Sequence, residues 1–237
     1  MRDRTRTRAP LRRPVWRSPI ALVSLGAVAL AVVAILALAA KPPPSDGEIL
    51  VPAMSYPEAL VDGEAVGRGD APVVIEVYSD FQCPVCGRFA KEYIPRLVTE
   101  FVADGRLRLV SRDIDMLGLS PSESLGAAVA ARCAGEQGRY WAFHDVLFWD
   151  QAGENLGGFR PGRLAEMADA LSLDRGAWDA CVADPANGGA IRATTNTAAS
   201  LGITATPTLS INGQLVRGLP GSYEALAALV SDLATAA

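Results

Sequence analysis

The sequence predicts an α/β fold in which a strand–helix–strand unit and a strand–strand–helix unit are separated by a helical insertion. Three observations predict it. Residues 73–112 change from a β-type run to a helical pattern and back to a β-type run. Residues 121–201 carry a succession of helical patterns. β-type alternation then returns at 202–217, before a last amphipathic helix at 221–234.

The first unit begins with a compact β-type run at 73–78, which predicts a buried strand. A helical pattern follows over residues 83–103, and Pro95 should kink it because proline cannot donate a hydrogen bond to the preceding turn. Residues 106–112 alternate charged and apolar side chains as a half-buried strand does. This order of elements predicts a right-handed unit with two parallel strands.

The helical insertion is predicted to open at residues 120–123. We expect Ser120 to be the N-cap, Pro121 to be the first helical residue and Glu123 to be the acidic partner of a capping box. Short helices follow to the end of the insertion. An Asn-Gly pair at 212–213 then lies between two β-type runs, which is the strongest short signal for a tight hairpin.

The N-terminal part of the chain divides into segments of different composition. Residues 1–19 form a basic tail, and residues 20–40 form an uncharged apolar run long enough to span a bilayer as a helix. Residues 41–64 form a Pro-rich linker. The domain is expected over residues 65–237, with its helical insertion at about 121–201.

The arginines before the apolar run predict which side of the membrane the domain occupies. They favour a cytoplasmic tail and an extracytoplasmic domain, as in a single-pass protein of the cell membrane. A cleaved signal peptide is the alternative, because residues 37–39 resemble a small-residue cleavage site. Both interpretations place the domain where disulfides persist.

Charge is distributed unevenly along the chain. Residues 1–40 contain seven arginines and one acid, a balance of +6, so the formal −4 of the whole chain leaves −10 for residues 41–237. An acidic domain without a basic stripe argues against a nucleic acid as partner.

The chemistry is predicted at Cys83-Pro84-Val85-Cys86, between the first strand and its helix. Pro84 suits the first helical position because it has no N–H that would be left unpaired there. Cys83 is then the N-cap residue, where free N–H groups and the helix dipole stabilise a thiolate. Cys86, one turn further on, can close a small ring with Cys83. The motif therefore predicts a reversible dithiol/disulfide centre.

Two other interpretations of the motif are open. It could supply half of a zinc site, but zinc takes four ligands at matched spacing, and Cys133 and Cys181 form no second Cys-x-x-Cys. The single histidine, His144, is adjacent to neither of these cysteines. The motif could also be a purely structural bridge. No Gly-rich phosphate loop or Gly-x-Ser-x-Gly motif occurs in the sequence, and we expect neither a cofactor nor a metal.

Three motifs of the chain match one known family together. They are YSDFQCPxC at 78–86, QGxYWxFHD at 137–145 and GIxxTPT at 202–208. Over residues 65–235 the chain resembles the DsbA-like thiol-disulfide oxidoreductases of the thioredoxin-fold superfamily. The resemblance implies a thioredoxin fold with a helical insertion between its βαβ and ββα halves, and the apolar run adds one N-terminal transmembrane helix before it.

The resemblance implies roles for residues around the two cysteines. The Thr206–Pro207 bond is expected to be cis and to face both sulfurs, with Thr206 pairing with an extended substrate. Pro84 and Val85 are expected at the substrate-binding surface. DsbA carries a histidine at the position of Val85, where it helps to stabilise the thiolate. Valine therefore predicts a less strongly oxidising centre.

Glu76, in the middle of the first strand, is expected from the same resemblance to move protons to and from the sulfur of Cys86. Burial would raise the pKa of its carboxyl group and suit that role. The alternation of a strand also allows its side chain to point to an exposed face.

Cys133 and Cys181 fall on helices of the insertion, and in an oxidising compartment they most simply form a structural disulfide. A second redox relay is the alternative for this pair. His144 lies on a predicted helix, where a packed or capping histidine is commoner than a catalytic one.

The sequence thus predicts an extracytoplasmic thiol-disulfide oxidoreductase that oxidises cysteines of secreted or membrane proteins through Cys83 and Cys86, assisted by Pro207 and Glu76. The resemblance implies a quinone-linked membrane reoxidant of the DsbB or vitamin K epoxide reductase type. A reductase or isomerase with the same site is one alternative. A non-catalytic peptide-binding domain, in which the two cysteines form a staple, is the alternative from another class.

Overall fold

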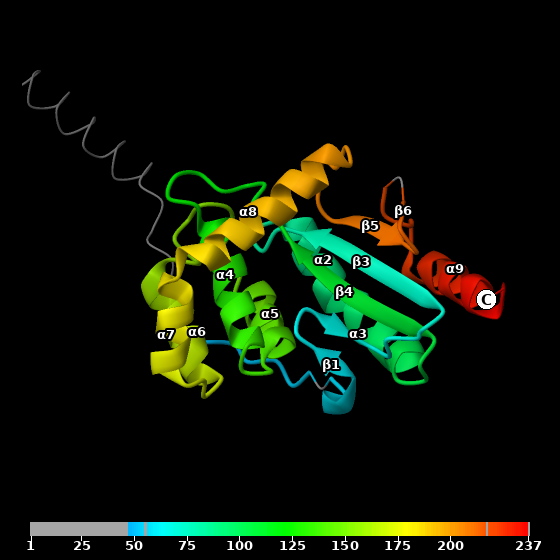
Figure 1. The fold of residues 1–237 in the computed structure, drawn as a ribbon, viewed down its shortest axis with the longest axis horizontal. Coiled ribbons are helices and arrows are strands. Elements are labelled where there is room, and N and C mark those ends of the chain that lie inside the picture. Colours follow the sequence, from blue (N-terminus) through cyan, green and yellow to red (C-terminus); the bar gives the residue numbers. More distant parts are fainter. Residues whose placement is uncertain (1–46, 55, 217, 237) are drawn as a thin grey trace, which may run out of the picture. The chain divides into compact units, whose positions relative to one another are not determined.

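The structure is a computed structural model that describes residues 47–236 except 55 and 217. The basic tail at 1–19, the apolar run at 20–40 and the start of the linker lie outside the described residues. Within the described part of the chain, no helix is both long and apolar enough to cross a membrane. The described residues form one mixed sheet flanked by helices (Figure 1).

The sheet contains six strands in the described chain, in the order β1-β2-β4-β3-β5-β6. Its centre is the parallel pair of β3 (Val73–Ser79) and β4 (Leu107–Asp113), which pair along their whole length. β5 (Thr208–Ile211) runs antiparallel to β3, and β6 (Gln214–Leu215) forms a hairpin with β5. The predicted parallel pair and the C-terminal hairpin are confirmed.

The hairpin follows from the two residues at its tip. Asn212 and Gly213 have φ angles of 48° and 79°, and a two-residue turn between twisted strands needs this left-handed conformation at both positions. The Asn212 side chain also accepts a hydrogen bond from the backbone N–H of Val74, at 2.8 Å. The turn is thereby fixed to β3, the central strand.

Two short strands extend the sheet beyond β4. β1 (Val61–Asp62) follows the 3₁₀ turn η2 (Glu58–Leu60) and pairs with β2 (Ala65–Val66), which in turn pairs with β4. Glu64, between them, forms an ion pair with Arg132 at 2.9 Å. The domain boundary predicted at residue 65 therefore falls inside the sheet.

The predicted helix after β3 is built from three pieces. α2 (Pro84–Glu92) has Tyr93 as its C-cap, α3 (Ile94–Leu97) carries Pro95 in its first turn, and the π-helical segment η3 (Val98–Val102) completes the element. The helix is interrupted at Tyr93, two residues before Pro95, where the kink is predicted. The sequence does not predict the π-helical segment.

The insertion consists of five helices in the described chain: α4 (Glu123–Gly135), α5 (Tyr140–Trp149), α6 (Pro161–Ala170), α7 (Arg175–Ala183) and α8 (Pro185–Ser200). Its predicted limits, near 121 and 201, agree with these bounds. Figure 1 shows α4 to α7 grouped at one end of the sheet and α9 (Tyr223–Ala236) at the other.

The start of α4 differs from the prediction. Ser122, and not Ser120, is the N-cap, and its Oγ accepts a hydrogen bond from a backbone N–H three residues further on, at 3.0 Å. The carboxylate of Glu123 accepts hydrogen bonds from the backbone N–H groups of Gly157 and Phe159, both at 2.8 Å. The acid therefore ties α4 to the loop before α6.

Helices cover both faces of the sheet. On one face, Val77 of β3 points toward α2, and the ring of Tyr223 in α9 lies 5.7 Å, between centroids, from the ring of Tyr93, which connects α2 to α3. On the opposite face, Ala198 of α8 packs with Tyr78. Alternate residues of β3 therefore point to different layers, which decides which of them can reach the cysteine motif on α2.

Candidate active site

The cysteine motif occupies the N-terminus of α2. Cys83 is the N-cap residue, with extended backbone angles (φ −72°, ψ 119°), and Pro84 is the first helical residue. The Cys83 carbonyl accepts a hydrogen bond from the backbone N–H of Gly87 at 3.0 Å. The predicted position of Cys83 is confirmed, and its sulfur lies at the positive end of the helix dipole.

The two sulfurs differ in their access to solvent. Cys83 is 6 % exposed and Cys86 is 1 % exposed, and both carry free thiols. Cys86 packs among apolar side chains between α2 and the sheet. A reactant as large as a protein thiol can therefore approach Cys83 but not Cys86.

The two thiols also differ in acidity. The pKa of Cys83 is lowered to about 6, and the largest cause is a hydrogen bond from the Cys86 thiol. Burial opposes this shift. The Thr206 side chain and the backbone N–H groups of Cys86 and Val85 lower the pKa further. Burial raises the pKa of Cys86 well above that of a free thiol, and the neighbouring Cys83 raises it further. At neutral pH, Cys83 is therefore the thiolate and Cys86 is the protonated partner.

Thr206 and Pro207 come to the motif from the C-terminal half of the chain. Their peptide bond is cis, as the family resemblance implies. The pairing of β3 with β5 brings them there, because Tyr78 lies opposite Thr208. The Thr206 carbonyl oxygen lies 3.4 Å from Cys83 Sγ and accepts a hydrogen bond from the protonated Cys83 thiol, whereas the Thr206 side chain favours the Cys83 thiolate.

Pro84 and Val85 form the exposed side of the motif. Both side chains face solvent, that of Val85 being 37 % exposed. Valine has no polar atom that could contact a thiolate, so the helix N-terminus, Cys86 and Thr206 provide the stabilisation of Cys83. An apolar side chain beside the reactive sulfur is a surface that an incoming polypeptide can cover.

Glu76 is not part of this cluster, and the prediction that it moves protons to Cys86 is corrected. The alternation of β3 points Val77 and Ser79 toward Cys86 and Glu76 toward the other face. There the Glu76 carboxylate pairs with Arg112 at 2.7 Å and is 23 % exposed. The prediction failed because apolar residues on both sides of Glu76 do not reveal which face lies under α2.

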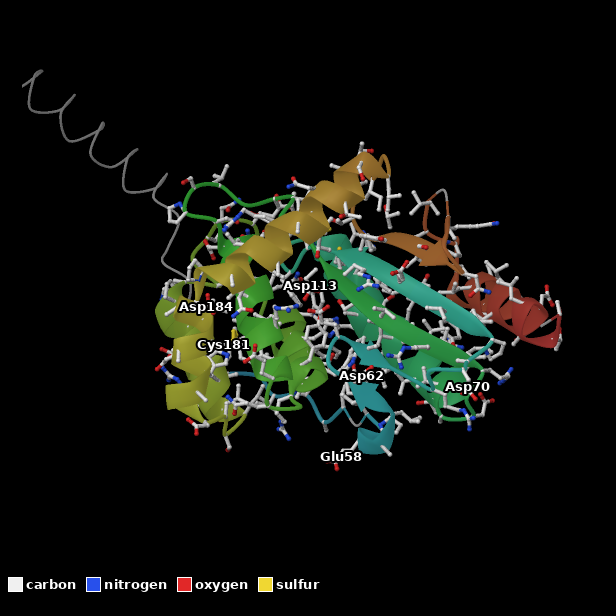
Figure 2. All side chains as sticks on the ribbon, in the orientation of Figure 1. Glu58, Asp62, Asp70, Asp113, Cys181 and Asp184 are labelled. Carbon is white, nitrogen blue, oxygen red and sulfur yellow. A yellow bond between two sulfur atoms is a disulfide. The ribbon has the colours of Figure 1, made fainter. Side chains whose placement is uncertain are left out.

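A buried acid lies instead on the neighbouring strand. Asp113, at the end of β4 beside the helical insertion (Figure 2), is 4 % exposed and accepts hydrogen bonds from Ser111 Oγ at 2.8 Å and from the Tyr140 hydroxyl at 2.7 Å. Burial raises the pKa of Asp113 to about 6, although the hydrogen bond from Tyr140 opposes this. The sequence carried a signal for this acid, because Asp113 continues the alternation of buried residues along β4.

A small cavity lies beneath the inner sulfur. Its volume is about 10 Å³, enough for about one water molecule. Cys86, Ser79, Ser111 and His144 supply polar groups to its lining. A hydrogen bond from Ser79 to Cys86 partly offsets the effect of burial on the pKa of this thiol. His144 thus lines the same cavity as Cys86.

Asp80 anchors the turn before Cys83. Its buried carboxylate accepts four hydrogen bonds of 2.7–2.9 Å, from the backbone N–H groups of Gln82, Met116 and Leu117 and from Ser124 Oγ. These bonds connect the motif to the loop after β4 and to α4. The sequence alone did not indicate this role of Asp80, although a buried acid directly after a strand requires hydrogen-bond partners.

Cys133 of α4 and Cys181 of α7 form the expected disulfide, 48 residues apart in the sequence. Figure 2 shows Cys181 on the helical insertion, away from the strands. The bond leaves neither sulfur free to complete a zinc site with Cys83 and Cys86. The two cysteine pairs therefore lie in different parts of the fold, one at the start of α2 and the other in the helical insertion.

Comparisons with known proteins match most of the described chain. A family model described as thioredoxin matches residues 60–232. The Na(+)/H(+) antiporter NhaA 3 of Salinispora tropica is 34 % identical over 164 residues, which cover 69 % of this chain and 24 % of the antiporter. A probable disulfide bond formation protein D of Bacillus anthracis is 30 % identical over 89 residues, which cover 37 % of this chain and 40 % of that protein.

Among solved structures, the crystal structure of oxidised BdbD from Bacillus subtilis matches with a TM-score of 0.65 and 20 % identity, covering 73 % of this chain and 93 % of that chain. At that identity the likeness concerns the fold. The chain spans about a quarter of the length of the antiporter and two fifths of the length of the Bacillus anthracis protein.

Proposed function

Because the chain belongs to the thioredoxin family and has its DsbA-like fold, we propose that it is a thiol-disulfide oxidoreductase whose reacting groups are Cys83 and Cys86. The observation that carries the proposal is the difference between the two thiols. The pKa of Cys83 is lowered to about 6, whereas burial raises that of Cys86. A nucleophile with a resolving thiol needs this difference, and a structural staple does not.

The reaction follows from the unequal access to the two sulfurs. In the oxidising direction, a substrate thiolate attacks Cys83 Sγ of the enzyme disulfide. The bond to Cys86 breaks, its electron pair goes to Cys86 Sγ, and that sulfur takes up a proton. A second substrate thiolate attacks the substrate sulfur of the mixed disulfide and releases the Cys83 thiolate. The substrate gains a disulfide, and the enzyme pair is reduced by two electrons.

The substrate is an extended, cysteine-containing polypeptide that lies across the motif. The Thr206 carbonyl, 3.4 Å from Cys83 Sγ, offers a backbone acceptor beside the reactive sulfur. Pro207 shapes this edge, and the exposed side chains of Pro84 and Val85 form an apolar surface next to it. Backbone pairing at Thr206 would make recognition tolerant of the substrate's sequence, because main-chain bonds do not depend on side chains.

The direction of electron flow depends on how strongly the thiolate is stabilised. A Cys83 pKa of about 6 lies between those of thioredoxin, roughly 7, and DsbA, roughly 3.5. We therefore expect a reduction potential between about −270 and −120 mV, the values of those two proteins. A value near the upper end supports the oxidase. Val85, which gives the thiolate no polar partner, favours the reductase or isomerase alternative at the lower end.

The oxidase direction also requires an oxidising compartment. The basic tail at 1–19 and the apolar run at 20–40 support a single-pass membrane protein with an extracytoplasmic domain. Its substrates would be secreted or membrane proteins with free cysteines. A quinone-linked membrane protein of the DsbB or vitamin K epoxide reductase type would then reoxidise Cys83 and Cys86.

The activity is tested by mixing the oxidised protein with a reduced, unfolded ribonuclease and following both the loss of substrate thiols and the recovery of ribonuclease activity. We expect stoichiometric oxidation by the wild-type chain and none by Cys83→Ser. The name of the Bacillus anthracis relative, a probable disulfide bond formation protein, supports this outcome. Binding of the unfolded ribonuclease without loss of its thiols would favour the non-catalytic peptide-binding domain.

The compartment is tested separately with spheroplasts. External protease should digest the domain at 65–237 and spare the basic tail, and the intact chain should fractionate with membranes. A shortened soluble product would show cleavage near residues 37–39 and end the anchor proposal. A domain protected in intact spheroplasts would contradict both the topology and the oxidase direction.

A further inference from the structure

His144 is the polar group near the reacting sulfurs whose role the reaction leaves unexplained. Its side chain, on α5, is 3 % exposed and lines the small cavity together with Cys86. Four aromatic rings surround the imidazole, with centroid distances of 5.8 Å to Phe81, 6.1 Å to Tyr140, 5.0 Å to Trp141 and 4.8 Å to Phe148. This packing fixes the orientation of the ring.

One ring nitrogen of His144 already has a hydrogen-bond partner. Nδ1 lies 2.9 Å from Oδ1 of Asp145, whose side chain is 1 % exposed. The Tyr56 hydroxyl donates to both carboxylate oxygens of Asp145, at 3.0 and 3.1 Å. A carboxylate can only accept hydrogen bonds, so Nδ1 of the neutral ring carries the proton and Nε2 is the acceptor.

Cys86 needs a partner for its proton. When the bond to Cys83 breaks, an electron pair remains on Cys86 Sγ at a site where burial strongly disfavours a thiolate. In the reverse direction, the Cys86 thiol must lose its proton for the sulfur to attack. The cavity offers the hydroxyl groups of Ser79 and Ser111 and the ring of His144. Of these three, only the imidazole has a ring nitrogen whose lone pair can take up a proton, because a hydroxyl group is a far weaker base.

We propose that His144 is the base and acid for Cys86, acting through one water molecule in the cavity. As Cys86 Sγ attacks Cys83 Sγ of a mixed disulfide, its proton passes to the water, and a proton of the water passes to Nε2 of His144. The new sulfur–sulfur bond forms, the substrate sulfur leaves with the electron pair, and Asp145 stabilises the imidazolium. In the oxidising direction the proton returns to Cys86. This role rests on the proposed oxidoreductase activity.

The titratable groups around His144 on the elements packed against it are Cys86 of α2, Asp113 of β4, Tyr140 and Asp145 of α5, and Tyr56. Asp113 is the rival proton acceptor. Its two carboxylate oxygens are bonded to Ser111 and Tyr140, and it does not line the cavity. His144 can thus reach Cys86 through one water, whereas Asp113 needs Ser111 as well.

The test follows the oxidation of the reduced, full-length chain by glutathione disulfide. In the first step Cys83 forms a mixed disulfide with glutathione, and in the second Cys86 displaces the glutathione. Acid quenching and mass analysis separate the two steps. His144→Asn keeps an amide N–H for Asp145 but has no base. We expect its second step to be about a hundredfold slower at pH 7 and to rise about tenfold per pH unit, because hydroxide must then take the proton.

The first step is the internal control, because it does not use the cavity, and His144→Asn should change it by less than about twofold. Asp145→Asn is a second variant, needed if His144→Asn does not fold. It keeps an acceptor for Nδ1 but lacks the charge that stabilises the imidazolium, and it should also slow the second step. Asp113→Asn is the matched control and should leave the pH slope of the wild type unchanged.

A folded His144→Asn chain with the wild-type rate and slope in the second step would overturn the proposal, and so would the steep pH slope in Asp113→Asn. Folding is checked by the unfolding midpoint and by the intact bond between Cys133 and Cys181. A wild-type chain that forms no mixed disulfide would refute the proposed activity itself, so the two failures are distinguishable.

Discussion

The molecule contains two cysteine pairs in opposite settings. Cys83 and Cys86 lie within one turn at the N-terminus of α2, whereas Cys133 and Cys181 join two helices of the insertion. Cys86 and Cys133 are equally buried, at 1 % exposure each, so burial alone does not decide which pair reacts. The difference is the helix N-terminus, which is available to a sulfur of the first pair only.

The pairs also differ in what a disulfide would do to the unfolded chain. The bond between Cys133 and Cys181 spans 48 residues and removes much of the freedom of a long loop. A bond between Cys83 and Cys86 would close a loop of one turn and remove little. The first bond is thus suited to stabilise the fold, and the second is suited to form and break in turnover.

The difference between the two pairs should be largest when one sulfur of each pair is removed. Cys83→Ala should reduce thiol oxidation of a reduced protein substrate by at least about a thousandfold, because the accessible nucleophile is lost. Cys181→Ala in the second pair should keep most of the specific activity. Titrating the remaining substrate thiols in samples quenched at successive times measures the rate for each variant. Equal losses in the two variants, with both shown to be folded, would mean that Cys133 and Cys181 form a relay.

The second pair should instead dominate stability. Replacing Cys133 and Cys181 together by Ala should lower the free energy of unfolding by about 4 kcal/mol in the chain-entropy model. Denaturant unfolding of the variant and of the wild type, both with Cys83 and Cys86 oxidised, measures the change. A loss well below 1 kcal/mol would contradict the stabilising role.

A pH series separates the two sulfurs of the first pair. The pKa of Cys83 is lowered to about 6 in the folded, reduced chain, so its stabilisation is present above the ordinary thiol pKa and is lost as the pH falls through about 6. The Tm of the reduced chain relative to the oxidised chain should therefore rise between pH 5.5 and about 8. A difference in Tm that stays constant over this range would mean that the Cys83 thiolate is not stabilised.

The smallest expected effect concerns Glu76. Its carboxylate pairs with Arg112 on the face of the sheet away from Cys86, so Glu76→Gln should change turnover by less than about twofold. The measurement is the rate of ribonuclease oxidation at pH 6, 7 and 8, with Asp113→Asn as the comparison on the other face. A loss of activity confined to one limb of the pH profile of Glu76→Gln would restore it as a proton carrier.

The sequence predicted β3 to β6, their hairpin and the position of Cys83 because each depends on local signals, whereas the short strands β1 and β2 were not predicted. Pro84 marks the first turn of α2, and an Asn-Gly pair marks the tip of the hairpin. The fold order followed from the same patterns, and the cis bond at Pro207 followed from the family resemblance. These features need only neighbours in the sequence or a known motif.

The sequence did not predict the surroundings of Cys86, because they depend on which face of each strand lies under α2. Glu76 was assigned to the wrong face, and the inward acid, Asp113, was overlooked. Tyr56 and Asp145 meet across 89 positions of the chain, a contact that no local pattern reports. The N-cap of α4 was predicted two residues too early, because the spacing from Ser120 to Glu123 matches a capping box, whereas the N-cap is Ser122.

The pKa values of two thiols three residues apart are shifted in opposite directions. Alkylating the reduced chain over a pH series and locating the label by mass spectrometry measures both pKa values. Cys83 should titrate with a pKa of about 6, and Cys86 should remain unlabelled until well above the ordinary thiol pKa of about 8.5. A Cys83 that titrates at about 8.5, or a Cys86 that is labelled faster than Cys83, would contradict the account.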